Sequence, residues 1–316
     1  MEATETKKKK YKPKKRQYRL KPGDYVFNII NYTVFFIFTL ICIFPFYYLF
    51  INTISDNDLV RIGAIKFFPQ GIHFKNYMAL KNVSALGTSI IVSLARTVIG
   101  TALMVMASGL TGYLVTQKEM WKRSFWYRFI VITMYFNAGL IPWFLTMSML
   151  GLTNNFMAYI IPSIVQPYNI ILVKTYIESI PHELEESAKI DGAGYFTIFR
   201  KIIWPLCKPI LATIAIFGAV GHWNSFTDSL MLMPNAPQLQ TVQHKLYIYL
   251  QQSSNLAAIM KSGGGASVSA GLQADLLNAK TIKYTISTVT IIPIVSVYPF
   301  MQRYFEKGIM LGAVKG

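Results

Sequence analysis

The acidic residues that could do chemistry gather in one short polar stretch, residues 179–209, between two long apolar runs. They are Glu183, Glu185, Glu186 and Asp191. Pro181 and the carboxylates after it predict a helix start, because the missing proline N–H needs no partner in a first turn and negative charge is favoured at the positive end of the helix dipole. Such a helix can lie in solvent or bind a partner, and the residues alone leave both interpretations open.

A turn and a second short helix complete this stretch. Residues 191–194, Asp-Gly-Ala-Gly, predict a tight turn, because glycine accepts backbone angles that other residues resist. The second helix is predicted from Tyr195 to Ile203, and Pro205 is predicted to end it. Its aromatic side chains make one face apolar, so the two helices need a groove that buries this face. The rest of the chain must therefore hold residues 179–205 where such a groove is available.

This stretch resembles the EAA loop of the permease subunits of binding-protein-dependent ABC importers. The residues that carry the likeness are Glu186-Ser187-Ala188, Asp191-Gly192-Ala193 and Ile202-x-Trp204-Pro205. Ser187 replaces the middle alanine of the motif and Trp204 replaces its leucine. Residues 219–225 and 308–316 are similar to the carbohydrate-uptake branch of this family, which includes permeases for complex oligosaccharides such as aldouronates. The likeness covers residues 25–316.

The resemblance implies an all-α membrane protein with the type I ABC importer permease fold, six transmembrane helices and a cytoplasmic EAA coupling hairpin. It implies a subunit that takes up a carbohydrate, an oligosaccharide, by alternating access and has no catalytic residues of its own. The implied partners are a sister permease, two cytosolic ATPase subunits, an extracellular sugar-binding protein and membrane lipid. No cofactor is expected on this chain, because ATP and Mg would be bound by the ATPase subunits.

The resemblance also implies roles for particular residues. It assigns ATPase coupling to Glu185, Glu186, Ala188, Asp191, Gly192, Ala193 and Pro205. Glu186 would meet a basic residue in a groove of the ATPase, and the Asp191-Gly192 turn would set the angle between the two helices. The alternative is that Glu186 only stabilises the start of its helix, and the two roles are compatible.

Composition places the chain in a membrane. Hydrophobic residues make up 53% of the 316 residues and charged residues only 14%, which is too apolar for a soluble domain of this length. The net charge of +17 does not indicate nucleic acid, because the basic residues lie between apolar runs rather than along one recognition helix. Cys42 and Cys207 have no CxxC or histidine neighbours that would predict a disulfide or a metal site.

Six apolar runs are long enough to predict transmembrane spans, each needing about 20 residues. The predicted spans are residues 26–54, 84–115, 124–150, 156–177, 206–233 and 282–300. A basic head at 1–24 precedes this 25–305 permease domain, a tail at 306–316 follows it, and the longest connection is the loop 234–280. By position, this loop resembles the external loop that reaches the sugar-binding protein, and its alternative is a loose surface loop.

The distribution of lysine and arginine predicts the orientation. Residues 1–24, 118–128, 174–208 and 303–316 hold 22 of these residues, against 8 in residues 61–81 and 245–283 on the opposite side. The positive-inside rule therefore predicts that both termini and the polar stretch lie in the cytoplasm. ATP is available on that side. The resemblance implies a multi-pass protein of the bacterial plasma membrane.

A few polar and aromatic residues lie inside the predicted spans. They are Arg96, Asn137, Trp223, Asn224 and Asp228. Sugars present hydroxyls and apolar C–H faces, which suits Asn, Asp and Trp along a substrate pathway, whereas hydrogen bonding between helices is the alternative. Arg96 is costly in hydrocarbon, so we expect it to face a cavity, pair with a carboxylate or reach the interface.

Two other classes of protein are possible from the residues. A self-contained secondary transporter would be expected to show inverted halves and ionisable groups at the membrane midplane, for which only Arg96 and Asp228 are candidates. A membrane-bound glycan enzyme would need paired carboxylates at a sugar site, whereas the acidic cluster lies at a helix start predicted to be cytoplasmic.

Overall fold

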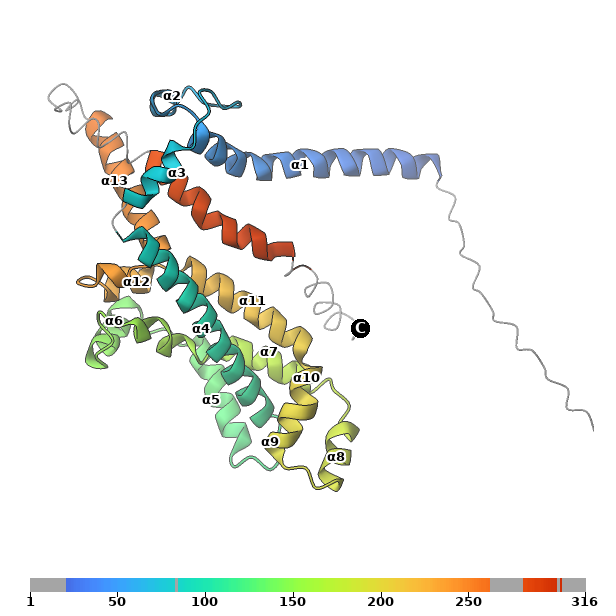
Figure 1. Cartoon of the computed structure of the whole chain (residues 1–316). Helices are drawn as coiled ribbons and strands as arrows, with labels where there is room; N and C mark the ends of the chain where they lie inside the picture. Colours follow the sequence, from blue (N-terminus) through green and yellow to red (C-terminus); the bar gives the residue numbers. More distant parts are fainter. Residues whose placement is uncertain (1–20, 83–84, 262–280, 300–301, 303–316) are drawn as a thin grey trace, which may run out of the picture. The chain divides into compact units, whose positions relative to one another are not determined.

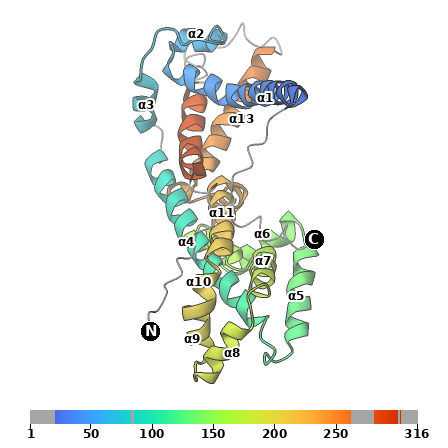
Figure 2. The same ribbon diagram turned by 90° about the vertical axis from the view of Figure 1, so that its right-hand side faces the viewer.

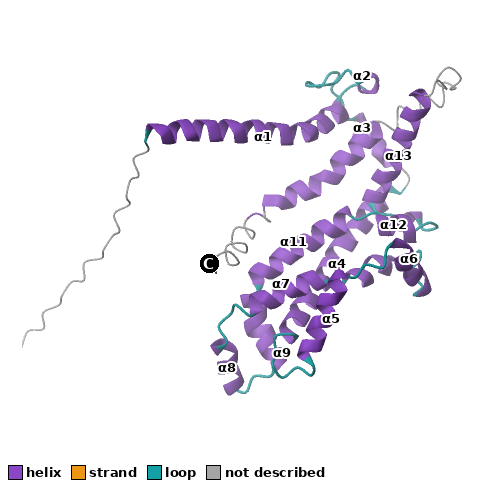
Figure 3. Ribbon diagram, turned by 180° about the vertical axis from the view of Figure 1, so that it is seen from behind, coloured by secondary structure: helices purple, strands orange, loops and turns teal. Residues whose placement is uncertain are grey.

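The computed structural model describes residues 21–82, 85–261, 281–299 and 302. Every regular element in these ranges is a helix (Figure 3), which confirms the predicted all-α class for the described residues. The chain divides into two compact units, Met1–Tyr48 and Leu49–Gly316. The predicted head is described only from residue 21 onward, and the tail at 306–316 lies outside the described residues.

The first unit contains most of α1 (Pro22–Ile54), a helix of 33 residues. Its apolar side chains are exposed on all sides over most of its length, from Tyr25 to Phe50. A helix that is apolar all round belongs in a hydrocarbon environment, and α1 is longer than the roughly 20 residues that a span requires. Its buried residues are at its C-terminal end, which belongs to the second unit.

The second unit is built around α4 (Leu86–Leu114), which packs against α11 (Lys208–Asn224) and α7 (Pro167–Ile177) (Figure 1). Small residues allow these helices to approach closely. A Cβ atom on Gly109 would lie 2.7 Å from the Trp204 ring, and one on Gly112 would lie 2.8 Å from Val173.

Several predicted spans are broken helices. In the described residues, three helices are long and apolar enough to cross a membrane, α1, α4 and the helix Thr281–Pro299, and up to six spans result if each of three bent pairs counts as one. The predicted span 124–150 consists of α5 (Arg123–Tyr135) and α6 (Leu140–Met149), which meet at 119°. The predicted span 156–177 consists of two short 3₁₀ segments, Phe156–Tyr159 and Ile161–Ser163, followed by α7 at 42°.

The prediction that Pro205 ends the second short helix is wrong. The helix continues from α9 (Tyr195–Ile198) through a π-helical segment (Phe199–Ile203) into α10 (Trp204–Leu206). Pro205 lies in the first turn of α10, where no N–H is needed, so it does not interrupt the chain. The break comes at Cys207, where the axis bends by 78° into α11.

The predicted fifth span is also shorter than expected. Residues 206–233 comprise the end of α10, then α11, and then a separate α12 (Thr227–Leu232) after a break at Ser225. The predicted loop 234–280 contains two helical elements, the 3₁₀ turn Pro237–Leu239 and the 20-residue α13 (Val242–Lys261). Its glycine-rich part, 263–265, lies outside the described residues.

Other helices lie next to the two ends of α4. Next to the start of α4 lie α3 (Lys75–Ala79), the 3₁₀ turn Leu80–Asn82 and α13, with α2 (Asn57–Ile62) beyond them (Figure 2). At the other end lie α8 (Glu183–Ile190) and α9, beside the loop that joins α4 to α5 (Figures 1 and 2). The polar stretch therefore lies at one end of the helical bundle.

Candidate functional site

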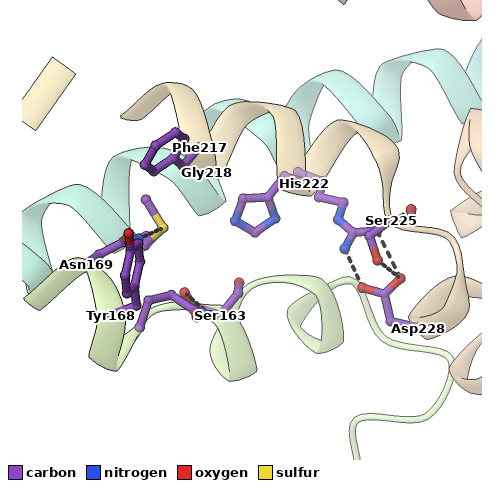
Figure 4. Close-up of a pocket in the computed structure, with 12 residues that line it drawn as sticks. Ser163, Tyr168, Asn169, Phe217, Gly218, His222, Ser225 and Asp228 are labelled. Carbon is purple, nitrogen blue, oxygen red and sulfur yellow. Dashed lines mark hydrogen bonds and ion pairs between the residues drawn. The ribbon is translucent and has the colours of Figure 1, made fainter. Parts of the chain in front are cut away.

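A cavity of about 520 Å³ with a mixed polar and apolar lining opens between α4, α7, α11 and α12 (Figure 4). Its lining includes charged, amide, hydroxyl, imidazole and aromatic side chains. The lining residues are Arg96, Met104, Ser163, Gln166, Tyr168, Asn169, Phe217, Gly218, Gly221, His222, Ser225 and Asp228. The volume and the mixed lining are those of a site for a small polar ligand.

A buried ion pair between Arg96 and Asp228 closes one end of this cavity (Figure 4). Arg96 Nη1 donates to Asp228 Oδ1 at 3.1 Å and to the Ser225 carbonyl at 3.2 Å, while Nη2 donates to Asp228 Oδ2. The Ser225 carbonyl belongs to the break between α11 and α12, so the guanidinium satisfies a group that the broken helix leaves unpaired. The Tyr159 ring lies 4.6 Å from the guanidinium carbon. One of the environments predicted for Arg96, a pair with a carboxylate, is therefore confirmed.

His222 points into the cavity from α11 (Figure 4). Its position depends on Gly100 of α4, because a Cβ atom there would lie 2.4 Å from the imidazole Cε1. Across the cavity, the Asn169 amide nitrogen of α7 donates to Met104 Sδ at 3.2 Å. Among the described residues, neither the imidazole nor the Asn169 carbonyl oxygen has a hydrogen-bonding partner.

Three residues predicted for the substrate pathway lie outside the cavity. Trp223 is buried beside it and its indole donates to the Thr290 carbonyl at 3.0 Å. Asn224 is exposed and accepts from the Gln243 amide at 3.3 Å. Asn137 lies in the break between α5 and α6, where its side chain accepts from the Gly139 N–H at 2.9 Å. Their observed contacts are those of helix packing and turns.

The polar stretch forms a helical hairpin, α8 and α9, joined by a turn at Asp191–Gly194. Gly192 has φ +80°, which favours glycine, and the Ala193 N–H donates to the Ala188 carbonyl at 2.9 Å. Ala188 and Ile198 are buried in a core that the hairpin shares with α4, α7 and α11. The predicted turn is confirmed, and the hairpin buries one of its faces within its own chain.

The opposite face of the hairpin is exposed and mixes acidic with apolar groups. Glu183 and Glu186 are exposed, as are Ile190 at 86% and Phe196 at 69%. Apolar side chains this exposed at the tip of a helical hairpin, with carboxylates beside them, fit a surface that binds another protein.

The neighbouring residue Glu185 is bound within the chain. Its side chain is only 15% exposed, and its Oε1 accepts from the Tyr113 hydroxyl at 3.2 Å and lies 3.7 Å from Lys189 Nζ. Lys189 Nζ also lies 3.4 Å from Glu119 Oε1, in the loop after α4. Tyr113 packs against Phe199 of the second helix, with ring centroids 5.4 Å apart. These contacts attach α8 to the end of α4.

The charges of this attachment stabilise each other. Partial burial lowers the pKa of Lys189, but the Glu119 and Glu185 carboxylates outweigh it, so the pKa is raised above its ordinary value of 10.5. The pKa of the Glu119 carboxyl lies below its ordinary value of 4.5. The main cause is a hydrogen bond from the backbone N–H of Glu119, and the positive charge of Lys189 adds to it. Both groups are therefore charged at neutral pH.

Sequence reasoning missed His222, Asn169 and Tyr113. A signal for His222 was present, since Gly218, Gly221, His222 and Ser225 follow the i, i+3, i+4, i+7 spacing of one helix face. No comparable signal marked Asn169 or Tyr113, because their roles depend on which helices pack together.

A bundle of apolar helices that encloses a cavity and presents an exposed acidic hairpin at one end fits a membrane transport component. The family of binding-protein-dependent transport system inner membrane components matches residues 108–311. The chain is 32% identical over 293 residues to the polygalacturonan/rhamnogalacturonan transport system permease protein YtcP of Bacillus subtilis (strain 168), covering 92% of this chain and 99% of that protein.

Further comparisons agree. The arabinooligosaccharides transport system permease protein AraQ of Halalkalibacterium halodurans is 28% identical, covering 87% of this chain and 92% of that protein. A crystal structure of a bacterial ABC transporter involved in the import of the acidic polysaccharide alginate has a chain with a TM-score of 0.77 and 29% identity, covering 92% of this chain and 100% of that one.

The chain belongs to the family of binding-protein-dependent transport system inner membrane components. It is a permease subunit of an ABC transporter and not an enzyme. The resemblance found in the sequence is thereby confirmed, and neither the secondary transporter nor the glycan enzyme is favoured.

Proposed function

We propose that this permease subunit conducts an oligosaccharide into a bacterial cell and that the α8–α9 hairpin couples its movement to ATP hydrolysis by separate ATPase subunits. The observation that carries the coupling role is the two-sided hairpin. One face is part of the core that α4, α7 and α11 share, while the other exposes Glu186, Ile190 and Phe196. A force applied to the exposed face is therefore transmitted directly to the helices that line the cavity.

The substrate class is supported by two independent observations. The similar proteins named above are described as permeases for arabinooligosaccharides and polygalacturonan and as an alginate importer. The cavity offers imidazole, amide and hydroxyl groups together with Tyr168 and Phe217, a combination that suits the hydroxyls and C–H faces of a sugar.

The proposed assembly places this chain beside a sister permease, with two ATPase subunits on the cytoplasmic side and a sugar-binding protein outside. In this arrangement the chain crosses the membrane six times, counting each bent pair as one span, and both termini are cytoplasmic. ATP and Mg would be bound by the ATPase subunits, with no cofactor on this chain.

The cycle needs only differential binding. ATP and the loaded binding protein must bind the outward-open state more tightly than the resting state, and hydrolysis then restores the resting state.

The proposed coupling residues have separable roles. Glu186 contacts the ATPase, Ala188 anchors α8 in the core, and Asp191, Gly192 and Ala193 form the turn. Pro205 lies in the helix that connects the hairpin to the bend before α11.

The test uses the complete importer, purified with its sister permease, ATPases and binding protein. Exchanging Glu186→Ala is expected to weaken ATPase binding or to abolish sugar-stimulated ATP hydrolysis. The matched control is Glu178→Ala, a largely exposed carboxylate at the end of α7 and outside the hairpin. If Glu186→Ala leaves both assembly and stimulated hydrolysis intact, the coupling role is wrong.

A further inference from the structure

The ion pair at the end of the cavity uses most of its hydrogen-bonding groups within the chain. Asp228 Oδ1 accepts from Arg96 Nη1, from the Ser225 hydroxyl at 3.2 Å and from the Ser229 N–H at 2.9 Å, and Oδ2 accepts from Arg96 Nη2. Both terminal nitrogens of Arg96 are engaged, and the Tyr159 ring covers the guanidinium. The Arg96 Nε is buried and has no partner among the described residues.

The cavity is consequently uncharged in sum. The charges of Arg96 and Asp228 cancel each other. Apart from the Tyr168 phenol, His222 is the one other ionisable side chain among the lining residues. A carboxylate or sulfate on a ligand would find the one arginine of the lining already paired with Asp228, so its desolvation would be poorly compensated. The lining selects against an anionic group.

The unused groups in the cavity are neutral and suited to hydroxyls. Neutral imidazole offers one donor and one acceptor, and the Asn169 carbonyl oxygen is an acceptor without a partner among the described residues. These groups belong to the same lining and come from α11 and α7 (Figure 4), with Tyr168 and Phe217 from the same two helices also among the lining residues. A sugar hydroxyl both donates and accepts, and an apolar sugar face packs on aromatic rings.

We propose that the cavity binds an uncharged sugar residue and that His222 and Asn169, rather than the Arg96–Asp228 pair, are its hydrogen-bonding groups. The inference rests on the proposed function and narrows its substrate class. It also distinguishes this chain from the structurally similar alginate importer, which is described as importing an acidic polysaccharide.

The experiment measures the sugar affinity of the purified complex of both permeases and the ATPases. The binding protein is left out, so that the permeases alone select the ligand. The probes are neutral trisaccharides of glucose, galactose, arabinose and xylose, and the trimers of galacturonate and mannuronate. We expect a neutral trimer to stabilise the complex against thermal unfolding at lower concentration than either uronate trimer. Loss of one hydrogen bond to the sugar in His222→Ala should weaken its binding about tenfold.

Two further variants make the result specific. His222→Gln keeps an amide donor and acceptor and should recover part of the affinity. His244→Gln replaces another buried histidine, which contacts Ser229 and does not line the cavity, and should leave the affinity unchanged. Tighter binding of a uronate trimer, or equal affinity in His222→Ala and the unmodified complex, overturns this inference alone. If no carbohydrate of either kind is bound or accumulated, the proposed substrate class is overturned as well.

Discussion

Removal of Asp228 is the perturbation whose consequence follows most directly from the structure. Asp228→Ala deletes the carboxylate partner of Arg96, whose side chain is 4% exposed. It also removes the acceptor of the Ser225 hydroxyl and the Ser229 N–H. Breaking a buried pair by removing one partner costs about 3–5 kcal/mol, because the remaining charge is left in a medium that solvates it poorly.

The assay is equilibrium unfolding of the purified permease complex in mixed micelles, with the free energy of unfolding compared between variants. The double variant Arg96→Met/Asp228→Leu removes both charges and replaces them by apolar groups of similar volume. It should recover most of the loss, because no unpaired charge remains.

A second ion pair in the same chain provides the matched control. Lys174 and Glu178 are joined at 2.8 Å across one helical turn, but the Glu178 side chain is 44% exposed. Glu178→Ala should therefore cost less than about 0.5 kcal/mol. The reasoning is refuted if Asp228→Ala costs no more than Glu178→Ala, or if the double variant is as unstable as the single one.

Two further predictions concern the packing and the attachment of the hairpin. Gly112→Ala places a Cβ atom 2.8 Å from Val173 in α7 and should lower the free energy of unfolding by about 1–3 kcal/mol, whereas Gly87→Ala in the same helix meets nothing within 4 Å and should not destabilise. Equal destabilisation by the two would contradict the close α4–α7 contact. The Lys189–Glu119 attachment should be constant from about pH 6 to 9, as measured by the distance between spin labels on α8 and on the loop after α4. The raised pKa of Lys189 means that its contribution is complete below pH 10.5 and lost as pH rises through the raised value. The lowered pKa of Glu119 means that its contribution is complete above pH 4.5 and lost as pH falls through the lowered value, so a change in distance between pH 6 and 9 would contradict the assignment.

The local features of the polar stretch could be predicted from its residues. The acidic helix start, the Asp191-Gly192 turn and the second helix each depend on residues close in sequence, whose backbone preferences act wherever the chain lies. The apolar runs were also found from length and composition, but three of the six are bent helix pairs, and these bends were not predicted. The end at Pro205 was mispredicted, because proline is tolerated in the first turn of a helical segment and nothing local distinguishes that position from a stop.

The tertiary structure alone decided which polar groups meet. Arg96 and Asp228 are 132 residues apart in sequence, and their pairing depends on α4 packing beside the break after α11. Glu185 and Glu186 are adjacent and chemically identical, yet one is bound by Tyr113 and the other is exposed, because successive residues of a helix point about 100° apart. Periodicity identifies the residues that share a helix face, whereas the neighbour of that face is set by the packing of the whole bundle.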